Sequence, residues 1–99
     1  MENNIKGLFI VVAWYEGIPY ILQGRNVLNW YFANNSPKVY KNLKTATKAA
    51  YKVWSRYKSK VVKVYRINED EMIGGDTIRK FEREMPERIV FEHKVPMAA

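Results

Sequence analysis

Residues 8–15 have the sequence LFIVVAWY, an unbroken run of apolar residues rich in β-branched and aromatic side chains. Such residues favour extended backbone, and a run without polar alternation is typical of a strand that is covered on both faces. We therefore predict a central strand here. Because side chains alternate along a strand, Trp14 and Tyr15 should face opposite sides of the sheet.

The residues that follow this strand predict a β-hairpin. Residues 16–19 (EGIP) include the glycine and proline that commonly interrupt strands, and apolar residues resume over 20–23. Residues 27–32 fit either a third strand or a covering loop, and residues 33–37 predict a loop. A short extended segment is expected over 38–40.

A long helix is the next element. Asn42 suits an N-cap, because its side chain can accept hydrogen bonds from the first free backbone N–H groups. The sequence from there to about Lys58, NLKTATKAAYKVWSRYK, keeps a helical period. Its apolar residues share one stripe: Leu43, Ala46, Ala50, Val53, Trp54 and Tyr57.

The last third of the chain predicts three further elements. Residues 61–67 favour a strand, and a short helix capped by Asp76 should run to about Met85, where Pro86 ends it. In that helix Ile78, Phe81 and Met85 share a face. A final strand begins at residues 89–91. The predicted fold class is α+β: a small antiparallel sheet of about four strands, one main helix packed on one face, and a short second helix.

Length and composition narrow the class of protein. The chain of 99 residues is one domain, with a core over about 7–95 and a frayed tail at 96–99. It has no cysteine, which excludes disulfides and thiol chemistry, and its single histidine is His93. No membrane span and no signal-peptide pattern is recognisable, so we expect a cytoplasmic protein.

Charge is distributed very unevenly along the chain. The formal net charge is +7, and residues 17–68 contain eleven basic residues and no acidic one. Such a segment suggests a basic face that meets nucleic acid, an anionic lipid surface or an acidic protein patch. The alternative is that the acidic residues of 69–99 fold back over that face and neutralise it.

The sequence offers little support for catalysis. The pair Gly74-Gly75 lacks the flanking pattern of a phosphate-binding loop. Glu69, Asp70 and Glu71 lack the spacing of a calcium loop and suit a solvated turn. His93 has no nucleophile at a recognisable spacing. We therefore expect a protein that is not an enzyme, with no cofactor and no metal.

The candidate binding residues are basic and aromatic. Lys44, Lys48, Lys52 and Arg56 follow one another every four residues, so a helix would bring them into one row that advances about 6 Å per step. The alternative is an ordinary solvated lysine face. Exposed aromatic residues beside bases can stack on nucleobases or anchor a protein partner, although core packing is the commoner role. The complete predicted set is Trp30, Tyr31, Lys41, Lys44, Lys48, Lys52, Arg56, Lys60 and Lys63.

The segment 38–50, KVYKNLKTATKAA, joins a strand end to a capped helix rich in alanine and lysine. It resembles a feature of small accessory proteins of phages and mobile elements from low-GC bacteria, and the order of elements over residues 8–67 is similar to theirs. The resemblance implies a host-takeover or anti-defence factor that acts by stoichiometric binding in the cytoplasm of an infected or host bacterial cell. It assigns no functional residue.

Two functional hypotheses follow. The first is a non-enzymatic phage-type protein that inhibits a host macromolecule, a defence nuclease or another nucleic-acid-handling enzyme, or a complex of such an enzyme with nucleic acid. The second is a sequence-independent DNA- or RNA-binding protein, whose affinity would fall steeply with salt. A self-associating virion component is a third alternative. A membrane partner is not expected.

Overall fold

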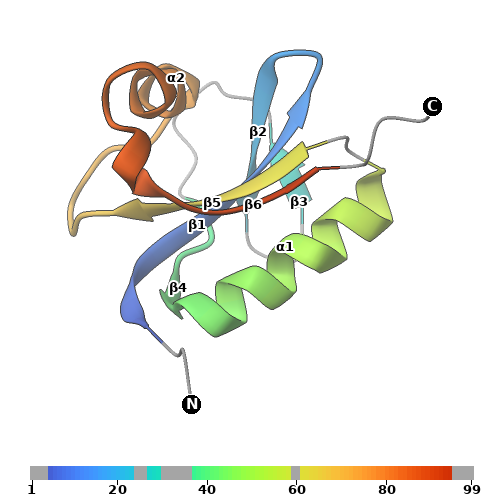
Figure 1. The fold of residues 1–99 in the computed structure, drawn as a ribbon, viewed down its shortest axis with the longest axis horizontal. Coiled ribbons are helices and arrows are strands. Elements are labelled where there is room, and N and C mark those ends of the chain that lie inside the picture. The colour runs from blue at the N-terminus through green and yellow to red at the C-terminus, as the bar shows by residue number, and fades with distance from the viewer. Residues whose placement is uncertain (1–4, 24–26, 30–36, 59–60, 95–99) are drawn as a thin grey trace.

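The structure is a computed structural model that describes residues 5–23, 27–29, 37–58 and 61–94. Its elements follow the predicted order of strands and helices (Figure 1). They are β1 (Lys6–Tyr15), β2 (Ile18–Gln23), β3 (Val27–Asn29), β4 (Tyr40–Asn42), α1 (Leu43–Tyr57), β5 (Val61–Ile67), α2 (Gly75–Glu84), the 3-10 turn η2 (Pro86–Arg88) and β6 (Ile89–Lys94).

Strand β1 lies at the centre of one antiparallel sheet with the order β3-β2-β1-β5-β6. Along one edge it pairs with β5 from Leu8 to Trp14. Its other edge is shared, because β2 pairs with its second half and β4 with its first half. The predicted central strand and the α+β class are confirmed, and the short strands β3 and β4 extend the four-strand sheet that the sequence indicated.

The first two strands are joined by a two-residue turn. Glu16 and Gly17 both have positive φ angles, 50° and 81°, as a type I′ turn requires. Tyr15 pairs with Ile18 directly beside this turn. The predicted hairpin is therefore confirmed, and β3 shows that residues 27–29 of the ambiguous segment form a strand.

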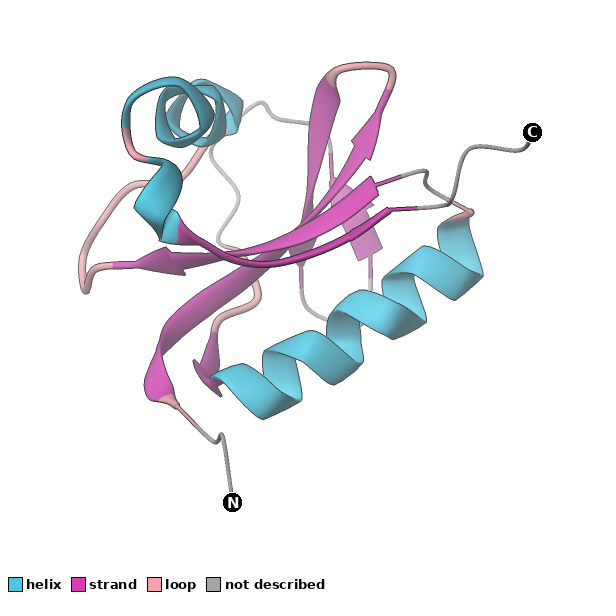
Figure 2. Cartoon of the chain, in the orientation of Figure 1, coloured by secondary structure: helices cyan, strands magenta, loops and turns pink. Residues whose placement is uncertain are grey.

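Each face of the sheet is covered by a different helix, and each carries its own apolar core (Figure 2). On the α1 side, Phe9, Val11 and Ala13 of β1 pack with Ala46, Ala50 and Val53 of the helix. On the α2 side, Ile10 and Val12 of β1 pack with Tyr65, Ile78 and Phe81. Trp14 joins the α2 side and Tyr15 the α1 side, as the alternation of side chains predicts.

Helix α1 begins and ends where the sequence indicates. The Asn42 Oδ1 accepts hydrogen bonds from both the backbone N–H and the hydroxyl of Thr45, each at 2.8 Å. At the other end Lys58 has a left-handed φ of 58° and its N–H donates to the Trp54 carbonyl. Both alanines of the apolar stripe and the neighbouring Ala49 are buried, which lets the helix lie close to β1.

Replacing Asn42 with alanine is expected to lower the free energy of unfolding by about 1 kcal/mol, because the first turn of α1 loses the acceptor for the Thr45 N–H. Chemical denaturation measures the change. Asn42→Asp, which keeps a side-chain acceptor at the same place, is the control and should retain most of the stability. Equal losses in the two variants would contradict the capping role.

Helix α2 corrects one detail of the sequence analysis. Its N-cap is Gly74, not Asp76, which lies inside the first turn. The Thr77 hydroxyl accepts the Gly74 N–H at 3.1 Å and donates to the Met72 carbonyl, so the helix begins two residues earlier than predicted. Asp76 still favours the helix, because a carboxylate near the N-terminus interacts well with the helix dipole.

Arg88 links the turn after β5 to the sheet through hydrogen bonds. Its guanidinium holds both carboxylate oxygens of Glu71, at 2.9 and 3.2 Å, and also donates to the Arg66 carbonyl. It lies 4.7 Å from the centre of the Phe81 ring. Partial burial by itself would raise the pKa of Glu71, but the Arg88 contacts and the Asn68 N–H outweigh it, so that the pKa is lowered.

Candidate binding surface on helix α1

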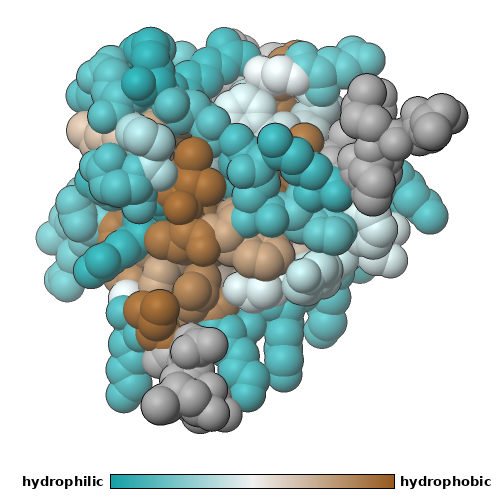
Figure 3. All heavy atoms as spheres, in the orientation of Figure 1, coloured by the Kyte–Doolittle hydropathy of each residue, from teal (hydrophilic) through white to brown (hydrophobic). Residues whose placement is uncertain are grey.

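A row of basic side chains lies on the solvent side of α1. Lys44, Lys48, Lys52 and Arg56 are all exposed, opposite the stripe that packs on the sheet, and Lys41 is exposed in β4 just before the helix. We call Lys44, Lys48, Lys52 and Arg56 the basic row. Hydrophilic side chains project from the molecule along the edge where α1 lies (Figure 3). The predicted row is thus displayed on one rigid element.

Four acidic residues in the last third of the chain form ion pairs with residues outside α1. Helix α2 covers the opposite face of the sheet from α1 (Figure 1). In the part of the chain that the structure describes, Lys48, Lys52 and Arg56 form no ion pair. The four ion pairs join Glu71 with Arg88, Glu82 with Lys63, Glu84 with Arg83 and Glu92 with Lys94.

The basic row works against the stability of its own helix. Like charges four residues apart on a helix repel each other by about 0.2–0.5 kcal/mol per pair. The row contains three such neighbouring pairs, and α1 has no acidic residue in its first turn to offset them. Packing of the apolar stripe on the sheet therefore stabilises α1. The basic row adds positive potential to its surface and lowers the stability of the helix slightly.

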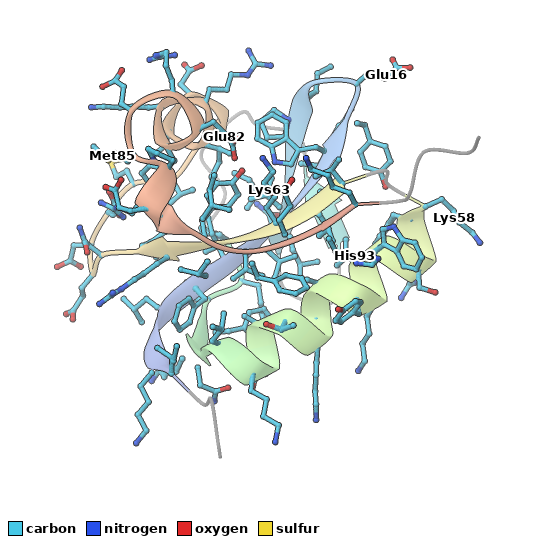
Figure 4. All side chains as sticks on the ribbon, in the orientation of Figure 1. Glu16, Lys58, Lys63, Glu82, Met85 and His93 are labelled. Atoms are coloured by element: carbon cyan, nitrogen blue, oxygen red, sulfur yellow. The ribbon has the colours of Figure 1, made fainter. Side chains whose placement is uncertain are left out.

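An aromatic cluster borders the basic row on its β6 side. The Tyr51 ring lies 5.0 Å from His93 and 5.5 Å from Phe91, and the Trp54 ring lies 4.6 Å from His93, all as centroid distances. We call Tyr51, Trp54, Phe91 and His93 the aromatic cluster. His93 lies beside α1 (Figure 4), between two aromatic rings and in a packing role.

Tyr51 is the residue of this surface that the sequence analysis missed. It is 46% exposed, an unusual value for a large side chain on a packed helix. It falls outside the apolar stripe, three residues after Lys48 and directly before Lys52. That position was visible in the helical period, and an aromatic residue outside the stripe was the signal that could have identified it.

Lys63 does not join the basic row. It lies on β5 with its side chain on the α2 side of the sheet, where it points toward Glu82 (Figure 4). Its ammonium donates to both carboxylate oxygens of Glu82, at 2.8 and 2.9 Å, and its side chain is only 14% exposed. Alternation along β5 is the reason, because Val62 and Val64 occupy the α1 side.

Glu82 is the centre of a partly buried polar network. The Tyr65 hydroxyl donates to its carboxylate at 2.5 Å, and the Trp14 indole N–H donates to the Tyr65 oxygen at 3.0 Å. Burial, and then the neighbouring Glu82 carboxylate, raises the pKa of Tyr65, so its hydroxyl remains a neutral donor. This network joins α2 to β1 and β5, which gives it a structural role.

The remaining predicted site residues lie outside the described residues. They are Trp30, Tyr31 and Lys60, together with the neighbouring Phe32. The candidate binding surface therefore consists of Lys41, the basic row and the exposed part of the aromatic cluster.

Within residues 5–23, 27–29, 37–58 and 61–94, no group of three or more His, Asp or Glu side chains is placed to hold a metal ion. Neither α1 nor α2 has the length and apolar character needed to span a bilayer. Comparison of the chain with models of protein families, with characterised proteins and with solved structures finds no match.

Proposed function

We propose that this protein is a non-enzymatic binding protein of the phage accessory type. It inhibits a host macromolecule, a defence nuclease or another nucleic-acid-handling enzyme, by stoichiometric binding through α1. The observation that carries the proposal is the exposed basic row, which has no acidic neighbour on its helix. The resemblance to phage accessory proteins indicates that the partner is a host macromolecule.

The physical basis is electrostatic complementarity. Enzymes that cut or copy nucleic acids commonly bind metal ions through clustered carboxylates, which leaves an acidic patch at the active site. A convex helix that displays four positive charges fits such a patch and is steered toward it during diffusion. Tyr51 adds an aromatic anchor beside the charges, of the type that dominates the energy of many interfaces.

Direct binding of nucleic acid is the second candidate. It is favoured by the regular spacing of the basic row, which advances about 6 Å per step and so suits contacts with several phosphates of one strand. This candidate requires no protein partner. It predicts an affinity that falls linearly with salt on a double logarithmic plot.

The test begins with cross-linked capture of partners from a bacterial host by the wild-type protein and by the Lys48→Glu/Lys52→Glu variant. A host enzyme captured only by the wild type is then purified and assayed with increasing amounts of this protein. Inhibition that saturates at a fixed molar ratio supports the proposal. Capture of the same proteins by both forms, or an enzyme whose activity does not change, would argue against it.

A further inference from the structure

We infer that the surface formed by the basic row and Tyr51 binds single-stranded nucleic acid, with a base stacked on the Tyr51 ring and the neighbouring phosphates held by Lys48 and Lys52. This activity is separate from the proposed inhibition of an enzyme. It would allow the protein to contact a strand already held by its partner. It concerns isolated oligonucleotides, so it can fail while the proposed function stands.

The first support is the way in which Tyr51 is held. Phe91 and His93 meet its ring at 67° and 61°, both in edge contacts, so β6 braces the side chain from the sheet side. The ring is nevertheless 46% exposed. A braced tyrosine loses little conformational freedom when a ligand stacks on it, because its rotamer is already restricted.

The second support is the position of Tyr51 relative to charge. Residues three apart on a helix are neighbours on its surface, which places Tyr51 next to Lys48. Lys52 points about 100° away from Tyr51 around the helix axis, so it lies beyond Lys48 and continues the basic row from there. The side chains of Glu92 and Lys94 alternate with those of Phe91 and His93 along β6 and pair with each other. The side of β6 that faces Tyr51 thus presents aromatic rings rather than carboxylates.

The combination of a ring and a row of cations selects a single strand over a duplex. Stacking on a protein side chain requires an accessible base face, and in a duplex those faces are covered by neighbouring base pairs. Single-stranded nucleic acid binders pair a basic track for the backbone with aromatic side chains for the bases, and they tolerate many sequences. The α1 surface has both parts on adjacent positions of one helix.

The test uses fluorescence anisotropy with three labelled probes at low salt: a short oligothymidine, a base-free oligonucleotide of the same length, and a duplex. Tyr51→Ala is expected to lower affinity for oligothymidine by about five- to tenfold. It should leave the base-free probe unchanged. Tyr51→Phe keeps the ring and should bind like the wild type. A matching oligouridine probe shows whether RNA and DNA are bound alike.

The controls separate stacking from charge and from folding. Lys48→Glu should lower affinity for the oligothymidine and base-free probes alike, and Met72→Ala, which removes an 87% exposed side chain elsewhere, should change neither. Tyr51→Leu keeps apolar contact with Phe91, and it replaces Tyr51→Ala in the same comparison of probes if that variant unfolds. The inference is overturned if Tyr51→Ala weakens binding of the two single-stranded probes equally. It is also overturned if the wild type binds the duplex more tightly than oligothymidine, or does not bind oligothymidine.

Discussion

Replacing Lys48 and Lys52 together with glutamate is expected to weaken binding of the partner by roughly tenfold or more, because both side chains then repel an acidic surface that they attracted before. Both lysines are exposed at the centre of the basic row. Adding Lys44→Glu should deepen the loss. Titration calorimetry with the purified partner, or anisotropy with a nucleic acid probe, measures the change.

The same substitutions should leave the fold intact or make it slightly more stable. In the wild type all three neighbouring pairs of the row repel each other, whereas in the double variant Lys44 attracts Glu at 48 and Arg56 attracts Glu at 52. Two of three repulsions are thereby replaced by attractions, and at about 0.2–0.5 kcal/mol for each interaction lost or gained the change is worth roughly 1–2 kcal/mol. Weaker binding in a protein of equal or higher stability assigns the effect to the surface and not to unfolding.

The matched control for charge is Lys80→Glu/Arg83→Glu on α2, because both side chains are exposed and the net charge falls by the same amount. We expect this variant to bind almost as well as the wild type, apart from a small general effect on association rate. If the two double variants bind equally well, the position of the basic row is irrelevant and the binding surface lies elsewhere.

Glu82→Ala is expected to lower the free energy of unfolding by about 2–3 kcal/mol, since it leaves the Lys63 ammonium and the Tyr65 hydroxyl without their acceptor. Both groups are too enclosed to regain full hydration, with the Lys63 side chain only 14% exposed. In a domain of this size the melting temperature should fall by roughly 10–20 °C. Thermal and chemical denaturation provide the two measurements.

Two comparison variants show whether the loss comes from the network. Glu84→Ala removes a carboxylate that is 49% exposed and paired with Arg83 on the surface, so it should change stability by less than about 0.5 kcal/mol. The pair Lys63→Met/Glu82→Leu removes both charges at once and should recover much of the stability. Equal effects of Glu82→Ala and Glu84→Ala would show that the network contributes nothing beyond an exposed pair.

Elements with a strong local signal could be predicted from the sequence. The apolar run at 8–15 identified the central strand, because a strand covered on both faces needs no polar side chain and the run is short and rich in β-branched and aromatic residues. The helical period after Asn42 identified α1 together with its cap, since both depend on residues within a few positions of one another. The weaker signal at α2 placed the helix correctly but misplaced its cap by two residues.

The candidate site was only partly predictable, because the sequence indicates the features that depend on neighbouring residues and not those that depend on distant ones. The basic row depends on spacing within one helix, so its alignment on the solvent face followed from the sequence. Lys63 has the same charge but belongs to a strand, and its direction depends on which side of β5 the apolar residues face. The structure turns it toward Glu82, nineteen positions away in sequence.

The sequence by itself determined the local elements and the uneven distribution of charge, because these depend on neighbouring residues alone. Only the tertiary structure decided that α2 lies across the sheet from α1 and leaves Lys48, Lys52 and Arg56 without a pairing carboxylate among the described residues. It also decided that β6 braces Tyr51 at the edge of that row. Strand order and the choice of face are set by contacts between distant segments, which no local pattern encodes.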